Sequence, residues 1–353
     1  SIIDQEAVLE LARQLEIDGI MSFAVDPGVV TAAYVAENMG LPFAGSYEAV
    51  KILQNKDLFR NFLRDNGFNV PIACGYKSYD DLVKDLARFT FPVIVKPTDS
   101  AGSKGVTRVD TIDDLRVAFD HAKKFSIKGT VIVEEFIEKQ GCSSDCDSFS
   151  INGKMMLTTF NAQHFDHEAA NPYTPSAYSW PSTFTNAQEI ELQNEIQRLV
   201  ELLKLKTSIY NIETRIGVNG KPYIMEMSPR GGGNRLAEME RLITGNDMIE
   251  AAVCGALNLP VKPFKPRNIE GYWTEIVLHY DGIRECKFSG IEISPSLKIY
   301  ERYLDLYINP GETIRPFQGA NDAIGTFVMN FPNKETMEWA VANQSVWLKI
   351  ITI

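Results

Sequence analysis

Two acidic residues, Glu213 and Glu226, flank an Asn-Gly pair at 219–220 that predicts a hairpin turn. Counting outward from this turn places the two carboxylates opposite each other, or nearly so, on neighbouring strands. Facing carboxylates repel unless a cation lies between them, and Mg²⁺ prefers such oxygen ligands. Strand alternation puts Ser228 and Asn211 on the same side. The pair therefore predicts a magnesium site, with two exposed charges on a solvated sheet as the alternative.

A glycine-rich loop, residues 99–106, follows an apolar run that ends at Lys96. Small residues let several backbone N–H groups converge on one anion, and Lys96 and Lys104 add positive charge. The spacing differs from that of a Walker P-loop. The loop predicts phosphate binding, and a flexible surface hairpin with a solvated lysine explains it equally well.

Arg230 follows the second acidic strand directly and precedes three glycines, residues 231–233. A rigid guanidinium suits a phosphate or a carboxylate in two-pronged geometry. Consecutive glycines are entropically unfavourable, which indicates a close approach of backbone to a ligand. The alternative is a surface arginine beside a loop that merely turns.

The segment Glu134–Ile137 ends a predicted strand at 129–137. Its backbone groups are placed to hydrogen-bond an adenine edge, with Glu134 accepting from the exocyclic amine. An edge strand with exposed acids is an equal alternative.

The 353-residue chain carries a net charge of −11, which argues against nucleic acid as the main partner. No apolar stretch reaches the length of a membrane-spanning helix and no signal peptide is visible, so we expect a cytoplasmic protein. The five cysteines are odd in number and loosely spaced, as expected of free thiols in a reducing compartment. A zinc site built from Cys142, Cys146, His164 and His167 is disfavoured by the spacing.

Apolar periodicity and capping residues predict helices, and short apolar runs bounded by turn residues predict strands. The helices are expected at residues 4–14, 27–39, 47–67, 78–89, 111–125, 187–205 and 235–258. The strands are expected at 17–24, 41–45, 70–76, 91–97 and 129–137, in hairpins turning at 152–153 and 219–220, and throughout 271–353.

Taken in order, these motifs resemble the ATP-grasp superfamily, and the resemblance runs from residue 1 to about residue 353. Asn55-Lys56-Asp57, with Arg60, is similar to the first ATP-lysine segment of that family, and Val95-Lys96-Pro97 is similar to the second. Glu134–Ile137 resembles the adenine hinge. Glu213 together with Glu226-Met227-Ser228-Pro229-Arg230 resembles the metal-binding and catalytic signature.

The resemblance implies an α/β (α+β) fold in three parts. Residues 1–43 resemble the end of the doubly wound pre-ATP-grasp domain of carbamoyl-phosphate-synthase-like members, whose first half this chain does not show. Residues 44–265 would form the two-subdomain ATP-grasp core, with a mobile lid at about 90–136. Residues 266–353 would form a β-rich C-terminal domain.

The resemblance also implies roles for individual residues. ATP would be held by one set: Lys56, Lys96, Ser100, Gly102, Ser103, Gly105, Val106, Glu134, Glu135, Phe136, Ile137 and Asp145. Mg²⁺ (or Mn²⁺) would be held by Glu213, Glu226 and Ser228. The family usually has Asn where this chain has Ser228, and its ribose-binding acid corresponds to Asp145 or Asp147. Arg230 and Lys104 would act in catalysis.

The implied reaction activates a small carboxylate as an acyl phosphate, which an amine then attacks. Substrate contacts are expected from the long loop at 161–185, including His164, Tyr178 and Trp180, and from Arg230, Gly232 and Asn234. The alternatives are phosphorylation of carbamate or bicarbonate and a non-catalytic nucleotide-binding module. A homodimer is the default expectation for the assembly.

Overall fold

The computed structural model describes residues 1–100, 102–266 and 269–353, so Ala101 of the glycine loop and residues 267–268 lie outside the described residues. The chain forms two compact units. The first unit contains residues 1–141, 145–159 and 184–267; the second contains 142–144, 160–183 and 268–353. Both combine helices with antiparallel sheets, which confirms the predicted mixed α/β class.

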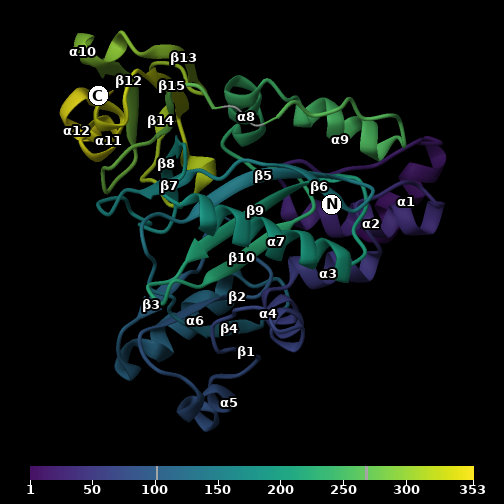
Figure 1. Ribbon diagram of the computed structural model, residues 1–353. Coiled ribbons are helices and arrows are strands. Elements are labelled where there is room, and N and C mark those ends of the chain that lie inside the picture. Colours follow the sequence, from purple (N-terminus) through teal and green to yellow (C-terminus); the bar gives the residue numbers. More distant parts are fainter. Residues whose placement is uncertain (101, 267–268) are drawn as a thin grey trace. The chain divides into compact units, whose positions relative to one another are not determined.

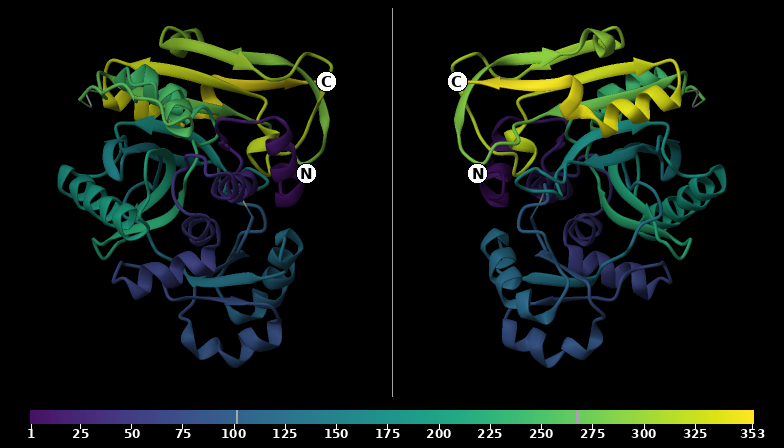
Figure 2. Two further views of the ribbon diagram at one scale, coloured as in Figure 1. Left: turned by 90° about the vertical axis from the view of Figure 1, so that its right-hand side faces the viewer. Right: turned by 90° about the vertical axis from the view of Figure 1, so that its left-hand side faces the viewer.

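The first unit opens with four helices, which Figure 1 labels. They are α1 (Gln5–Gln14), α2 (Asp26–Met39), α3 (Tyr47–Gln54) and α4 (Lys56–Asp65). The first two lie side by side (Figure 2). Leu9, Ala12 and Val35 form the small apolar core between them. Gly40, with a φ of 68°, ends α2 as expected, because its missing Cβ permits the left-handed conformation.

The strands predicted at 17–24 and 41–45 are wrong. Both segments are irregular, because the described residues offer neither one a neighbouring strand for a hydrogen-bonded ladder. Instead, Ala24 N–H donates to the carbonyl of Gly231 at 3.1 Å. The segment before α2 thus lies against the glycine triplet.

The single helix predicted at 47–67 is two helices. Asn55 adopts an extended conformation between α3 and α4, and its side chain caps α4 by accepting a hydrogen bond from Leu58 N–H at 3.0 Å. The helix predicted at 235–258 is likewise divided into α8 (Leu236–Thr244) and α9 (Met248–Ala256), where Gly245 ends the first and Asp247 caps the second.

Two four-stranded sheets complete the first unit, with strand orders β1-β4-β2-β3 and β10-β9-β5-β6. The strands of the first sheet are β1 (Ala73–Tyr76), β2 (Val93–Pro97), β3 (Thr107–Val109) and β4 (Val131–Glu135). It packs against α6 (Leu115–Phe125) through a core that includes Val93, Val131 and Phe119. The short helix α5 (Tyr79–Lys84) adds Leu82 to that core.

The second sheet consists of β5 (Ser144–Ile151), β6 (Lys154–Thr158), β9 (Ser208–Ile216) and β10 (Pro222–Ser228). The predicted hairpin at 152–153 is confirmed, with positive φ angles at both turn residues. The amphipathic helix α7 (Asn186–Leu202) packs along β6 and β10, and α9 packs on β9 (Figure 2).

The second unit contains a five-stranded sheet, β13-β15-β11-β8-β7, and a three-stranded sheet, β14-β12-β16. One apolar core joins them, with Ile276 and Phe327 from the first sheet and Phe288 from the second. The strands are β7 (Ala162–Phe165), β8 (Pro175–Trp180), β11 (Tyr272–Leu278), β12 (Cys286–Ile293), β13 (Glu301–Leu306), β14 (Thr313–Ile314), β15 (Gly325–Phe331) and β16 (Leu348–Thr352), and the helices are α10 (Pro295–Lys298), α11 (Lys334–Ala342) and α12 (Gln344–Trp347). The predicted β-rich C-terminal region thus gains β7 and β8 from the middle of the chain, because β8 hydrogen-bonds to β11.

Within the described residues, no helix is both long enough and apolar enough to cross a membrane.

Candidate active site

Glu213 and Glu226 are direct Cα partners on β9 and β10, as the sequence predicts. The ladder nearest the turn pairs Ile224 with Thr214, and Met225 bulges out before Glu226 pairs with Glu213. This one-residue bulge places the two carboxylates in register, because it offsets a turn longer than two residues. Both side chains are about one-third exposed and therefore accessible to a cation.

Cations of the protein already approach this acidic pair. Lys56 Nζ lies 3.4 Å from Glu226 Oε2, and Arg215 Nη2 lies 3.6 Å from Glu213 Oε1. Lys56 also donates a 3.0 Å hydrogen bond to the carbonyl of Ser100, at the start of the glycine loop. Because Lys56 is the first residue of α4, the Asn55 cap fixes where its side chain starts. Lys56 thus joins the glycine loop to the acidic strands.

Ser228, expected as a metal ligand, is buried and already engaged. Its hydroxyl donates to Asp26 Oδ1 at 2.8 Å and accepts from Gln54 Nε2 at 2.7 Å. Its Cα partner Asn211 donates to Asp145 Oδ1 at 2.7 Å. The donor set therefore fits one Mg²⁺ on Glu213 and Glu226, whereas a role for Ser228 would require these hydrogen bonds to rearrange.

Arg230 is held by Asp26, the first residue of α2. Its Nε and Nη2 donate to the two carboxylate oxygens at 2.8 and 2.7 Å, and its Nη1 donates to the carbonyl of Gly231 at 3.1 Å. Burial alone would raise the pKa of Asp26, but Arg230 and Ser228 lower it. Burial alone would lower the pKa of Arg230, but Asp26 raises it. Both groups are therefore charged at neutral pH.

The sequence did not indicate a role for Asp26 in the site. Aspartate is common at the start of a helix, because its charge complements the helix dipole. The only signal was the Asp-Pro pair that opens α2.

The first two glycines of the triplet lie close to other protein atoms. A Cβ on Gly231 would lie 2.2 Å from the Phe23 ring, and one on Gly232 would lie 2.7 Å from Asn211 Nδ2. Gly232 N–H donates to Asp147 Oδ1 at 2.7 Å. Only Gly233 has open space where a Cβ would be. The close approach inferred from the triplet exists, but at the first two glycines it is to protein atoms. Asn234 follows with a positive φ of 49°.

Lys96 and Glu134 form a buried cluster with Arg60. Glu134 contacts Lys96 Nζ and accepts from Arg60 Nε at 3.0 Å, and Arg60 also binds the carbonyl of the bulged Met225 at 2.8 Å. Burial opposes ionisation of Glu134, but Arg60 and Lys96 lower its pKa to about 2. Burial lowers the pKa of Lys96.

The residues of the predicted adenine hinge, Glu134–Ile137, already interact with other parts of the protein. Both carboxylate oxygens of Glu134 face protein cations, so its expected contact with an adenine amine has no support in the structure. The N–H groups of Glu135 and Phe136 donate to the carbonyls of Ile72 and Pro92, at 2.9 and 3.0 Å. The carbonyl of Ile137 accepts from Arg215 at 3.0 Å.

Several described residues of the glycine loop have the left-handed conformation. Gly102, Ser103 and Gly105 all have positive φ, Lys104 is exposed, and Val106 N–H closes a turn on the Ser103 carbonyl at 3.4 Å. Asp99 anchors the base of the loop by accepting hydrogen bonds from residues 126–128. These hydrogen bonds hold the start of the loop against the segment that follows α6.

The two candidates for the ribose-binding acid lie beside the acidic strands instead. Asp147 is fully buried and accepts from Gly232 N–H. Burial raises the pKa of Asp147 to about 7, and burial together with the nearby charge of Glu213 does the same for Asp145. Asp147 is therefore not accessible to a ribose. Asp145 lies near Glu213 of the predicted metal site, whose charge affects its pKa.

Lys56, Glu226 and Asp26 share a cavity of about 380 Å³ in the first unit. Its wall combines acidic, basic and apolar side chains: Asp26, Asp99, Glu226, Lys51, Lys56, Lys128, Ile3, Pro27, Val30, Leu58 and Ile127, with further polar residues. Charges of both signs and this volume suit a small polar ligand.

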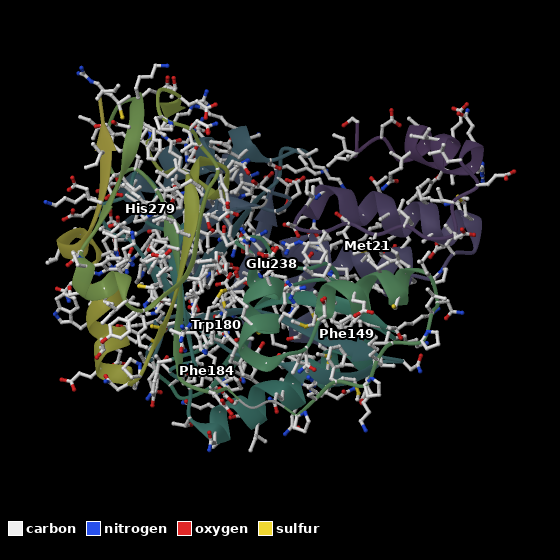
Figure 3. The ribbon with its side chains drawn as sticks, turned by 90° about the horizontal axis from the view of Figure 1, so that it is seen from above. Met21, Phe149, Trp180, Phe184, Glu238 and His279 are labelled. Atoms are coloured by element: carbon white, nitrogen blue, oxygen red, sulfur yellow. The ribbon has the colours of Figure 1, made fainter. Side chains whose placement is uncertain are left out.

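The substrate residues predicted in the loop at 161–185 lie in the second unit. His164 Nε2 is 2.9 Å from Ser179 Oγ, across the β7–β8 pair. Trp180, labelled in Figure 3, is fully buried, and its ring lies 6.4 Å from that of Tyr178. Their roles in substrate binding stay predictions.

The zinc ligands weighed in the sequence do not come together. In the part of the chain that the structure describes, the one grouping of potential metal ligands is Asp166, His279 and Asp281. Sequence reasoning missed it, because its members come from segments more than a hundred residues apart.

Among known protein families, the one described as ATP-grasp domain matches residues 89–238 of this chain. The chain is 25% identical over 280 residues to the carbamoyl phosphate synthase large chain of a Thermoanaerobacter species, covering 77% of this chain and 25% of that protein. It is 25% identical over 207 residues to the D-alanine–D-alanine ligase of Parabacteroides distasonis, covering 55% of this chain and 59% of the ligase. This chain thus spans about a quarter of the length of the synthase it matches.

Among solved structures, the L-amino acid ligase from Bacillus licheniformis superposes with a TM-score of 0.79. That match covers 99% of this chain and 85% of the ligase at 21% identity. At this identity the likeness shows the fold.

Proposed function

We propose that this chain, an ATP-grasp protein, is a magnesium-dependent ligase that joins a small carboxylate to an amine at the expense of ATP. The observation that carries the proposal is the in-register pair Glu213 and Glu226. Lys56, at the start of α4, contacts both Glu226 and the Ser100 carbonyl of the glycine loop. The two carboxylates are suited to bind a cation. The Lys56 amine and the backbone of the glycine loop lie next to them and are suited to bind phosphates.

In the proposed reaction, a carboxylate oxygen of the substrate attacks the γ-phosphorus of ATP. The bond to the β-phosphate oxygen breaks and ADP leaves, giving an acyl phosphate. The amine nitrogen then attacks the acyl carbon, loses a proton and expels phosphate. Bound Mg²⁺ would offset phosphate charge, and the residues that would hold it are Glu213 and Glu226.

Protein residues supply the remaining electrostatics. Lys56 and Lys96 would bind phosphate oxygens, and residues 99–106 would cover them and exclude water. Lys104, exposed at the loop, would join them on closure. Arg230 would stabilise the charge of the acyl phosphate through the guanidinium N–H groups that Asp26 and Gly231 do not use.

Two other functions have specific support. The similarity to carbamoyl phosphate synthase favours phosphorylation of bicarbonate or carbamate. The engagement of Arg230 by Asp26 and of Ser228 by Gln54 favours a module that binds nucleotide without turnover.

One assay separates the three functions. The purified chain is incubated with Mg-ATP and panels of small carboxylates, each with and without amines, while ADP and phosphate are measured. Release that needs both a carboxylate and an amine supports the ligase, and bicarbonate-dependent release supports the synthase-like reaction. ATP binding without release under any condition would support the module.

Arg230→Gln tests the role of the guanidinium. We expect turnover to fall at least a hundredfold with ATP affinity changed less than threefold, because Arg230 is proposed to act on the intermediate. The double variant Asp26→Asn with Arg230→Gln removes both charges of the pair and controls for an uncompensated Asp26. Wild-type turnover in Arg230→Gln would contradict the role.

A further inference from the structure

We propose that Asp166, His279 and Asp281 in the second unit form a binding site for a divalent transition metal, Zn²⁺ or Mn²⁺. Asp166 follows β7, whereas His279, labelled in Figure 3, and Asp281 follow β11. One ligand atom from each lies within 4.8 Å of the others. The site would fasten the β7–β8 loop to the end of β11.

The orientation of His279 is set from outside the cluster. Its Nδ1 lies 2.6 Å from the carbonyl oxygen of Val277, and because a carbonyl only accepts, Nδ1 carries the proton. The ring stacks on buried Phe317, with centroids 4.3 Å apart. Nε2 is therefore the nitrogen that faces the two carboxylates. Metal-binding histidines commonly donate their second N–H to a backbone carbonyl in this way.

The distances suit coordination. His279 Nε2 lies 3.2 Å from Asp166 Oδ2 and 3.1 Å from Asp281 Oδ1. Ligands about 2.1 Å from one ion, at tetrahedral or octahedral angles, are about 3.0–3.4 Å apart. The two separations from His279 therefore already lie in the range that a shared ion would impose.

Exposure gives the site an entrance. The His279 side chain is 7% exposed and Asp281 is 55% exposed, so the site is closed toward the protein and open toward solvent at one ligand. Water can complete the shell on that side. One imidazole with two carboxylates favours Zn²⁺ or Mn²⁺ over Mg²⁺ or Ca²⁺, which select oxygen ligands.

Hydrogen bonds already hold the β7–β8 loop at a second point. Asn171, in the β7–β8 loop, donates from its backbone to the carbonyl of Phe317 at 3.0 Å and from its side chain to that of Gln318 at 2.9 Å. A bound ion would add a tie at the beginning of the same loop. The metal would thus order part of the segment 161–185, independently of the proposed ligase activity.

A proton is the competing occupant. Burial disfavours the imidazolium, but hydrogen bonds to Asp166 and Asp281 raise the pKa of His279 to about 9. A charged histidine between two aspartates would satisfy the same groups, so a test must separate metal from proton.

The test uses the full chain, freed of metal with a chelator and then kept in excess Mg²⁺ to fill the oxygen sites near Glu226. Zn²⁺ is titrated by calorimetry and by ¹H–¹⁵N spectra of the histidine rings. The chain has four histidines, so His279→Gln assigns the signal. We expect Zn²⁺ to shift the His279 Nε2 signal, with one ion bound per chain. Asp281→Asn should weaken this binding at least tenfold.

Controls keep the result interpretable. Asp281 is exposed, so Asp281→Asn is expected to fold, and Glu292→Gln changes another exposed acid of the same unit. Glu292→Gln should leave the Zn²⁺ affinity of the His279 signal unchanged. Zn²⁺ bound at a cysteine would register in calorimetry but not at His279 Nε2. An Nε2 that keeps its proton at saturating Zn²⁺, or equal affinity in Asp281→Asn, would overturn the proposal.

Discussion

Asp26 and Arg230, 204 positions apart in the sequence, meet in a two-pronged ion pair with N···O distances of 2.8 and 2.7 Å. The pair links the start of α2 to the strand that carries Glu226. Because Arg230 is the residue proposed to act on the acyl phosphate, its position depends on the N-terminal helices.

Removing one partner of this pair is expected to destabilise the fold strongly. Asp26→Asn should lower the free energy of unfolding by about 3 kcal/mol, because it leaves a buried guanidinium without its counter-charge. In the Arg230→Gln background the same change should be much less damaging. Urea denaturation of the four proteins gives the coupling energy, and additive effects would show that the two side chains do not interact.

Gly231 and Gly233 should respond differently to the same substitution. Gly231→Ala is expected to lower the free energy of unfolding by about 1–3 kcal/mol, because the new Cβ would lie 2.2 Å from the Phe23 ring. Gly233→Ala should be tolerated, since nothing lies within 4 Å of its Cβ position. Thermal or urea unfolding compares the two variants; similar losses would mean that the Phe23 contact does not govern this loop.

Glu134 should make stability depend on pH. Its pKa falls from 4.5 in the unfolded chain to about 2 in the fold, through Arg60 and Lys96 and against the effect of burial. The folded state thus holds its proton less tightly, so the contribution is fully present above about pH 4.5 and is lost as the pH falls toward 2. It amounts to roughly 3 kcal/mol.

Glu134→Gln should therefore destabilise the protein at pH 7, and by about 2 kcal/mol less at pH 3. Urea denaturation at both pH values measures the difference, and Glu191→Gln, at an exposed position of α7, is the matched control. A deficit of equal size at pH 3 and pH 7 would contradict an ionised Glu134.

Glu226→Gln tests the predicted magnesium site. Removal of one of the paired charges should raise the Mg²⁺ concentration needed for ATP binding at least tenfold, because the amide is a weaker ligand. A fluorescent ATP analogue titrated at several Mg²⁺ concentrations measures this, with Glu201→Gln on exposed α7 surface as control. An unchanged Mg²⁺ requirement would place the ion elsewhere.

Local sequence signals determined much of the fold. The glycine that ends α2, the hairpin at 152–153 and the pairing of Glu213 with Glu226 follow from rules that act over a few residues. The breaks before α4 and α9 were not predicted, although Asn55 and Asp247 cap those helices. The ATP-grasp resemblance followed from the order of such segments, and the family match confirms it for residues 89–238.

Tertiary structure decided what depends on distant partners. The segments 17–24 and 41–45 have apolar runs suited to strands, but no strand in the described residues pairs with them. Glu134 has the sequence context of a hinge residue, yet Arg60 and Lys96 engage it. Asp26 left only an Asp-Pro pair as a local signal, because its partner Arg230 is 204 positions away. The metal-ligand cluster could not be predicted, because Asp166 is 113 positions from His279. Sequence spacing sets which side chains share a strand or helix face, whereas only the packed chain determines which opposite charge each one meets.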